Sequence, residues 1–244
     1  MEFESSSAVY AGRFHRAAGS PCQDRTAFAR TDRAVCAALA DGAGSRAHSE
    51  VGAACATAFA ARLLSSRFDA LWALSDEALR AELMEQCLAE LSRETLPLRE
   101  LACTLLFFAA HRDGRFLAGH IGDGVIVLSD AESRVLSTPE NGDTLSETYF
   151  LTGADAAEHL RVYRGTLPPE GTALLMSDGM AESLYRRFDG SPAPACGRIA
   201  QWLHEGDPQV VDQALAAHME KTFSRRSDDD LSLIAVAWEQ GAED

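Results

Sequence analysis

Short apolar runs that lack helical spacing predict β-strands along most of this chain. The run at residues 101–112 is apolar nearly throughout, so we expect a central strand covered on both faces. An Asp113-Gly114 pair then predicts a tight hairpin turn, and that turn alone accounts for Asp113. The predicted strands cover residues 9–11, 26–30, 34–40, 101–112, 115–120, 125–128, 161–163, 172–177 and 231–238.

Four other segments carry helical signals. Apolar residues recur at helical spacing through 49–64, and a second helix over 76–96 has Ser75 as its N-cap. Residues 195–203 predict a third helix, and Asp207-Pro208 opens a fourth that runs to about residue 223. We interpret the polar loop at 12–21 as irregular, and the acidic stretch at 138–157 as a flap over a site. No linker or repeat interrupts this pattern, so we expect one α+β domain over residues 1–244, with its core at 9–238 and layered sheets.

Carboxylates stand where several apolar strands end. Asp41-Gly42 follows the run 34–40, Gly122-Asp123-Gly124 follows the run 115–120, and Ser177-Asp178-Gly179 follows another. The order is reversed at Asp228-Asp229-Asp230, which precedes the last strand. A buried strand end is a costly place for an unpaired charge. Oxygen ligands gathered without His or Cys suit Mg²⁺ or Mn²⁺.

Composition limits the classes of function. The formal net charge of −15 argues against binding to nucleic acid and to anionic membranes, which need a basic face. The six cysteines form no CxxC pair, which predicts free thiols in a reducing compartment. The N-terminus shows no secretory signal, and the longest apolar run is too short to span a bilayer, so we expect a cytoplasmic enzyme.

The order and flanks of these motifs resemble those of the metal-dependent (PPM, type 2C) Ser/Thr protein phosphatases. The resemblance covers nearly the whole chain and is greatest to the compact bacterial members. The matching pieces are Gly12, His15, Pro21-Cys22-Gln23-Asp24, Ala40-Asp41-Gly42, Ala102-Cys103-Thr104, Ile121-Gly122-Asp123, Met176-Ser177-Asp178-Gly179 and Asp229-Asp230-Leu231-Ser232. The family implies a four-layer α/β/β/α sandwich, in which two antiparallel sheets are flanked by helix pairs.

The resemblance also implies a binuclear Mg²⁺ or Mn²⁺ centre at one end of the sandwich. Asp41 would bridge the two metals, the Gly42 carbonyl would bind the second, and Asp178 and Asp229 would complete the first. Asp24 would hold metal-bound waters. Asp123, with Asp178, would recruit a third, weaker metal.

In such a family member a metal-bound hydroxide attacks phosphorus in line. The implied activity is hydrolysis of phosphoserine and phosphothreonine in a phosphoprotein substrate, opposing a Ser/Thr kinase. Two other functions remain open from the sequence. One is a weak or inactive family member that binds phosphoproteins as a regulatory module, and the other is a phosphohydrolase of small metabolites.

The chain departs from the family pattern at the phosphate-binding arginine, whose usual slot is Gly19. Gln23 replaces a glutamate, and Ala43 replaces a histidine proposed as general acid in eukaryotic members. Counted forward from Gly12, His15 falls where the arginine usually lies. We therefore expect the loop to bulge so that His15, helped by Arg16 or Arg13, reaches the phosphate.

Overall fold

The computed structural model describes residues 1–142 and 148–241, and their strands form two five-stranded antiparallel sheets and one small hairpin. One sheet has the order β1-β12-β9-β6-β7 and the other the order β2-β3-β4-β5-β8. The first comprises β1 (Glu2–Tyr10), β12 (Leu231–Glu239), β9 (Glu170–Met176), β6 (Val125–Ser129) and β7 (Ser133–Ser137). The second comprises β2 (Arg25–Arg30), β3 (Ala34–Ala40), β4 (Leu105–His111), β5 (Arg115–Ile121) and β8 (Arg161–Thr166).

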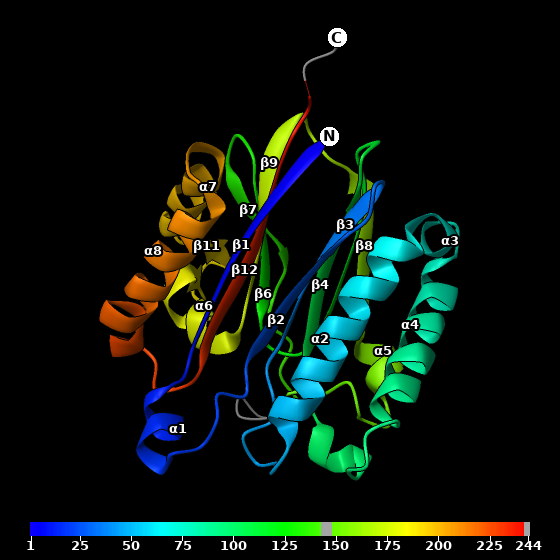
Figure 1. The fold of residues 1–244 in the computed structure, drawn as a ribbon, viewed down its shortest axis with the longest axis vertical. Helices are drawn as coiled ribbons and strands as arrows, with labels where there is room; N and C mark the ends of the chain where they lie inside the picture. Colours follow the sequence, from blue (N-terminus) through cyan, green and yellow to red (C-terminus); the bar gives the residue numbers. More distant parts are fainter. Residues whose placement is uncertain (143–147, 242–244) are drawn as a thin grey trace.

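Helices cover the outer face of each sheet, so the predicted four-layer α/β/β/α sandwich is confirmed (Figure 1). The helices outside the β3 sheet are α2 (Ser49–Ser66), α3 (Phe68–Trp72), α4 (Asp76–Leu91) and α5 (Ala156–His159). Those outside the β12 sheet are α6 (Asp178–Leu184), α7 (Ala195–Glu205) and α8 (Pro208–Lys221). The remaining elements are α1 (Arg13–Ala18), the hairpin β10 (Tyr185–Arg186) with β11 (Ser191–Pro192), and the 3₁₀ turns η1 (Leu98–Leu101) and η2 (Phe223–Arg225).

The core has three parts, one between the sheets and one beneath each helical layer. Between the sheets, Phe108 stacks on Trp238 with ring centroids 5.8 Å apart. Trp238 is 2% exposed and Phe108 is fully buried, so truncating either ring to alanine would cost about 3–5 kcal/mol. Small residues of α2, such as Gly52 and Ala53, allow that helix to pack closely on its surroundings. A Cβ on Gly52 would lie 2.0 Å from the carbonyl oxygen of Leu101, at the end of η1.

Three predicted boundaries are wrong. The strand expected over 9–11 is β1 (Glu2–Tyr10), which begins seven residues earlier and buries Phe3 in the core, so the core starts before residue 9. The helix expected over 76–96 ends at Leu91. Pro97 disfavours helical backbone at the residue before it, and Thr95 is β-branched, so the segment after Leu91 is a poor continuation of the helix. Ser75 does cap this helix, and its hydroxyl accepts the Ala78 N–H at 3.2 Å. The strand expected from residue 101 begins only at Leu105, because Cys103 pairs with Gly42 beside the Asp41 loop.

Other differences concern short elements without a strong periodic signal. The pattern omitted α1, α3, α5, α6, β7 and the β10–β11 hairpin, and α1 occupies the segment expected to be an irregular loop. The stretch 138–157 is largely irregular where it is described, and its residues 143–147 lie outside the described part of the chain. Within the described residues no helix is long and apolar enough to cross a membrane.

Candidate active site

The antiparallel register brings the predicted aspartates to one end of the sandwich. Arg25 pairs with Ala40, so Asp24 and Asp41 lie next to each other beyond the ends of β2 and β3. In the other sheet Met176 pairs with both Leu233 and Val125, which sets the segments holding Asp178, Asp229 and Asp123 side by side. Asp123 lies on the short connection by which the chain passes from β5 to β6, from one sheet to the other. We call the five residues Asp24, Asp41, Asp123, Asp178 and Asp229 the aspartate cluster.

Burial and mutual repulsion shift the pKa values within the aspartate cluster. Burial raises the pKa of Asp24 to about 7, and the nearby Ser232 and Ser177 hydroxyls limit the rise. Burial, and then the charges of Asp123 and Asp229, raise the pKa of Asp178 to about 8. The pKa of Asp41 is raised well above its usual range, first by burial and then by the other four carboxylates. The cluster therefore holds more negative charge than the surrounding protein neutralises.

Asp41 is held by the strand beside it. Its backbone N–H donates to Thr104 Oγ1 at 2.9 Å, and its carbonyl accepts the Thr104 N–H at 2.8 Å. Thr104 faces Gly122, where φ is +119° and an added Cβ would lie 2.5 Å from Thr104 Cγ2, so only glycine fits there. Thr104 thus joins the Asp41 and Asp123 turns, as a support for the strand end.

Gly42 is also fixed by its surroundings. Its N–H donates to the Gln23 carbonyl at 3.2 Å, and an added Cβ would lie 2.8 Å from the side chain of buried Ser49. Gln23 itself is buried, and its Oε1 has no hydrogen-bond partner among the described residues. The segments 23–24 and 41–42 therefore pack as one unit beside the cluster.

The donor set of this site fits hard divalent cations. Asp24 is fully buried, and neither of its carboxylate oxygens has a partner that meets hydrogen-bond geometry in the described structure. Five carboxylates, with no sulfur or imidazole donor among them, match the oxygen preference of Mg²⁺ and Mn²⁺. In this conformation no three acidic, His or Cys side chains of the described residues lie close enough together to hold a metal ion. Some carboxylates instead accept neighbouring backbone N–H groups: Asp178 Oδ1 that of Gly179 at 2.6 Å, and Asp229 Oδ1 that of Asp230 at 2.8 Å.

His15 does not lie on a bulged loop. It is on the short helix α1, and its Nδ1 lies 2.9 Å from Asp230 Oδ1, while its side chain is 18% exposed. The Nδ1 atom thus faces Asp230, which leaves Nε2 as the nitrogen that is able to meet a substrate. The expectation of a bulge was wrong because Gly12 at the N-cap and Gly19 at the C-cap, with φ +66°, enclose a sequence that forms a helix.

Arg16 is exposed, and its guanidinium lies over the Tyr10 ring at 4.7 Å. Arg13 forms an ion pair with Asp228. Neither contact brings an arginine into the aspartate cluster in this conformation. The roles of His15 and Arg16 in binding phosphate remain predictions.

Asp230 has a structural position that the sequence only hinted at. Its side chain is buried, and its two oxygens accept the backbone N–H groups of Gly12 and Gln23, each at 2.6 Å. These bonds lower the pKa of Asp230 despite its burial. Asp230 therefore ties the segment that carries Asp24 to the strand that follows Asp229.

Asp113 lies apart from the cluster, in agreement with its interpretation as a turn residue. Its carboxylate accepts the Arg115 N–H at 3.1 Å and Arg115 Nε at 2.8 Å, in the hairpin between β4 and β5. That hairpin is at the opposite end of β4 from Thr104 and Asp41.

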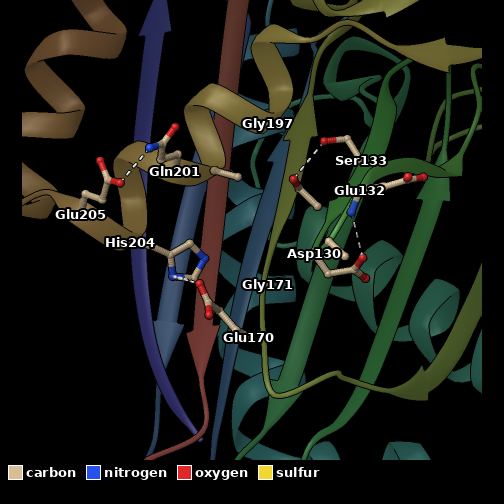
Figure 2. A pocket seen from close by; sticks show the side chains of 12 residues that line it. Asp130, Glu132, Ser133, Glu170, Gly171, Gly197, Gln201, His204 and Glu205 are labelled. Carbon is tan, nitrogen blue, oxygen red and sulfur yellow. Dashed lines mark hydrogen bonds and ion pairs between the residues drawn. The ribbon is translucent and has the colours of Figure 1, made fainter.

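A cavity of about 570 Å³ lies away from the cluster, between the β6–β7 turn and α7 (Figure 2). Asp130, Glu132, Glu170 and Glu205 give it an acidic rim, and His204 lies 3.9 Å from Glu170. None of the predicted site residues lines it. The volume of this cavity therefore does not identify the candidate active site.

Comparisons with known proteins agree with this geometry. The sequence pattern described as Protein phosphatase 2C matches residues 11–220. Serine/threonine-protein phosphatase 3 of Escherichia coli (strain K12) is 27% identical over 251 residues, which cover 94% of this chain and 97% of that protein.

Two solved structures share the fold at lower identity. A bacterial serine phosphatase superposes with a TM-score of 0.66 at 15% identity, over 99% of this chain and 100% of that one. RsbX, crystallised in complex with magnesium, has a TM-score of 0.60 at 15% identity, over 96% and 94% of the two chains. The family pattern spans most of the sequence, and the aspartates lie together where its motifs require. The chain therefore belongs to the protein phosphatase 2C family of serine/threonine phosphatases.

Proposed function

We propose that this chain hydrolyses phosphoserine and phosphothreonine in a phosphoprotein, at a binuclear Mg²⁺ or Mn²⁺ centre. One observation carries the proposal: Asp24, Asp123, Asp178 and Asp229 come from both sheets, yet all four carboxylates lie close enough to Asp41 to raise its pKa, in addition to the effect of burial. A cluster of this kind is costly in a folded protein unless cations neutralise it. When bound, divalent cations supply positive charge for the phosphate dianion and lower the pKa of a coordinated water.

Each residue has a role that follows from its position. Asp41 and the carbonyl of Gly42 would hold cations from the β3 side, and Asp178 and Asp229 from the β12 side. Asp123 would add a third, weaker site with Asp178. Asp24 is buried with unpaired oxygens, so it would accept hydrogen bonds from waters held in the site.

The phosphoryl group also needs an orienting group outside the cation centre. We propose that His15 supplies it through Nε2, since Asp230 is at its Nδ1. Arg16 is exposed one residue later and is the second candidate. The chain would act as a single catalytic domain in the cytoplasm, opposing a Ser/Thr kinase.

A direct assay tests the proposal. Hydrolysis of para-nitrophenyl phosphate and of a phosphothreonine peptide would be measured with Mn²⁺, with Mg²⁺ and with a chelator. We expect turnover with a cation and none with the chelator. Full activity in chelator, in protein shown to be free of metal, would overturn the metal-dependent function. Turnover of small metabolites alone would favour a metabolite phosphohydrolase instead.

A further inference from the structure

A second cavity, of about 310 Å³, borders the aspartate cluster at Asp229. It lies between α1, α6 and the segment that leads from α8 into β12. The residues that line it are Arg13, Phe14, Glu182, Arg225, Arg226, Ser227, Asp228 and Asp229. Because Asp229 belongs both to the cluster and to this cavity, whatever fills the cavity lies next to the reacting phosphate.

The lining holds three arginines and three carboxylates, and two of the arginines form no ion pair among the described residues. Arg13 is neutralised by its ion pair with Asp228. Arg225 and Arg226 are exposed, and within the described part of the chain neither side chain forms an ion pair or hydrogen bond. In Figure 1 their segment leaves the end of α8 and passes beside α1. Two free guanidinium groups thus adjoin the active end of a chain whose net charge is −15.

Since neither arginine has an ion pair or side-chain hydrogen bond among the described residues, both guanidinium groups are available to a partner outside the chain. A guanidinium donates paired hydrogen bonds to carboxylates and phosphates, which makes an anionic partner the match in chemistry. Phe14 adds an apolar element to the same cavity, since its side chain is 70% exposed. An anionic segment with some apolar surface, such as an acidic peptide, fits this lining.

We propose that Arg225 and Arg226 bind acidic side chains that flank the phosphorylated residue of the protein substrate. This inference rests on the proposed function, because it assumes that the phosphoryl group sits at the aspartate cluster. The arginines would select the substrate and would not contact the phosphoryl group. The class of substrate is then a phosphoprotein whose modified Ser or Thr lies in an acidic sequence.

The test compares two phosphothreonine peptides that differ only in having Glu or Gln on both sides of the modified residue. Wild type is expected to favour the Glu peptide by about tenfold in kcat/KM, the sum expected for two partly screened ion pairs. The preference should shrink as ionic strength rises from about 50 mM to about 300 mM. The double variant Arg225→Gln/Arg226→Gln should lose the preference and keep its rate on para-nitrophenyl phosphate.

Arg198→Gln is the matched control, because Arg198 is an exposed arginine on α7, outside this cavity. It should behave as wild type with both peptides. An unchanged preference in the double variant would overturn the proposal. So would an equal loss on para-nitrophenyl phosphate, which would assign the arginines to the phosphoryl group.

Binding of the same peptides, labelled with fluorescein and followed by anisotropy in chelator, separates this inference from the proposed function. If wild type hydrolyses neither peptide, yet binds the Glu peptide more tightly and needs Arg225 and Arg226 to do so, the proposed role of the two arginines stands. The proposed phosphatase activity is then contradicted. If wild type hydrolyses both peptides alike and binds both alike, the phosphatase activity is supported and the proposed role of Arg225 and Arg226 is overturned.

Discussion

The imidazole Nδ1 of His15 lies 2.9 Å from the buried Oδ1 of Asp230, and this carboxylate also accepts the backbone N–H groups of Gly12 and Gln23. Asp230 thereby holds both ends of the segment between β1 and β2. One side chain fixes the helix that carries His15 and the residue that precedes Asp24. The arrangement makes separate predictions for the two partners.

Replacing Asp230 by alanine should lower the free energy of unfolding by about 2–4 kcal/mol, because two backbone N–H groups would lose a charged acceptor. Relief of its repulsion on Asp24 would offset part of this loss. Urea unfolding of the chelated protein measures the effect. Asp228→Ala is the control, since Asp228 pairs with exposed Arg13 on the surface and should change stability by less than about 1 kcal/mol.

Replacing His15 by alanine should lower kcat/KM for para-nitrophenyl phosphate by about tenfold near pH 6.5, through a higher KM. Metal affinity, measured by calorimetry, should stay as in wild type. If His15→Ala and Arg16→Ala both leave the kinetics unchanged, the α1 segment does not hold the phosphate.

The variants Asp178→Asn and Asp229→Asn should each reduce kcat by about a hundredfold or more, because each removes a charged oxygen from the proposed cation centre and keeps the volume. Circular dichroism should show the fold intact. Asp113→Asn serves as the control, because Asp113 occupies a hairpin turn at the opposite end of β4. Wild-type turnover by either metal-loaded variant would remove that residue from the site.

Stability of the chelated protein should fall as pH rises from about 5 to 8. Asp24 and Asp178 have pKa values raised to about 7 and about 8, so the folded state binds more protons than the unfolded state over this interval. Stability is therefore fully present below the ordinary aspartate pKa and is lost as pH rises through the folded values. We expect a loss of about 2–4 kcal/mol by urea unfolding. Added Mn²⁺ should abolish the slope, and Asp178→Asn should reduce it. A flat or rising profile would contradict the charge repulsion in the cluster.

Strong periodic signals explain why much of the fold was predictable from the sequence. The run at 34–40 forms β3 with every residue buried. The helical spacing from Val51 to Phe59 correctly predicts α2, although the residues fully buried there are the small ones beside that stripe, such as Gly52, Ala53 and Ala56. Motif order placed Asp41 and Asp178 at strand ends that the register then brings together. The positions of such residues can be predicted because the local sequence pattern and the overall fold agree there.

Contacts between segments distant in sequence were not predictable in the same way. Asp230 accepts the N–H of Gly12, which is 218 positions away in the sequence, and no local sequence pattern predicts such a contact. The short helix α1 escaped notice because six residues give no measurable periodicity. The same holds for the cavity beside Asp229, which exists only because α1, α6 and the β12 approach meet there.

The position of β12 determines when the active end can form during protein synthesis. β12 lies between β1 and β9, so the earliest strand of this sheet has no partner until the latest one has been made. Gly12 packs closely against the backbone of Asp229, and an added Cβ would lie 2.3 Å from the Asp229 carbonyl carbon. This contact can form only when the segments around residues 12 and 229 are both in place. A ribosome-bound chain lacking the residues near 230 would therefore keep β1 exposed and the aspartates unassembled, and its folding would be slowed by the long loop that must close. Catalysis and the completed sheet would thus arise in the same late step, and incomplete chains would be both inactive and prone to pair through the open edge of β1.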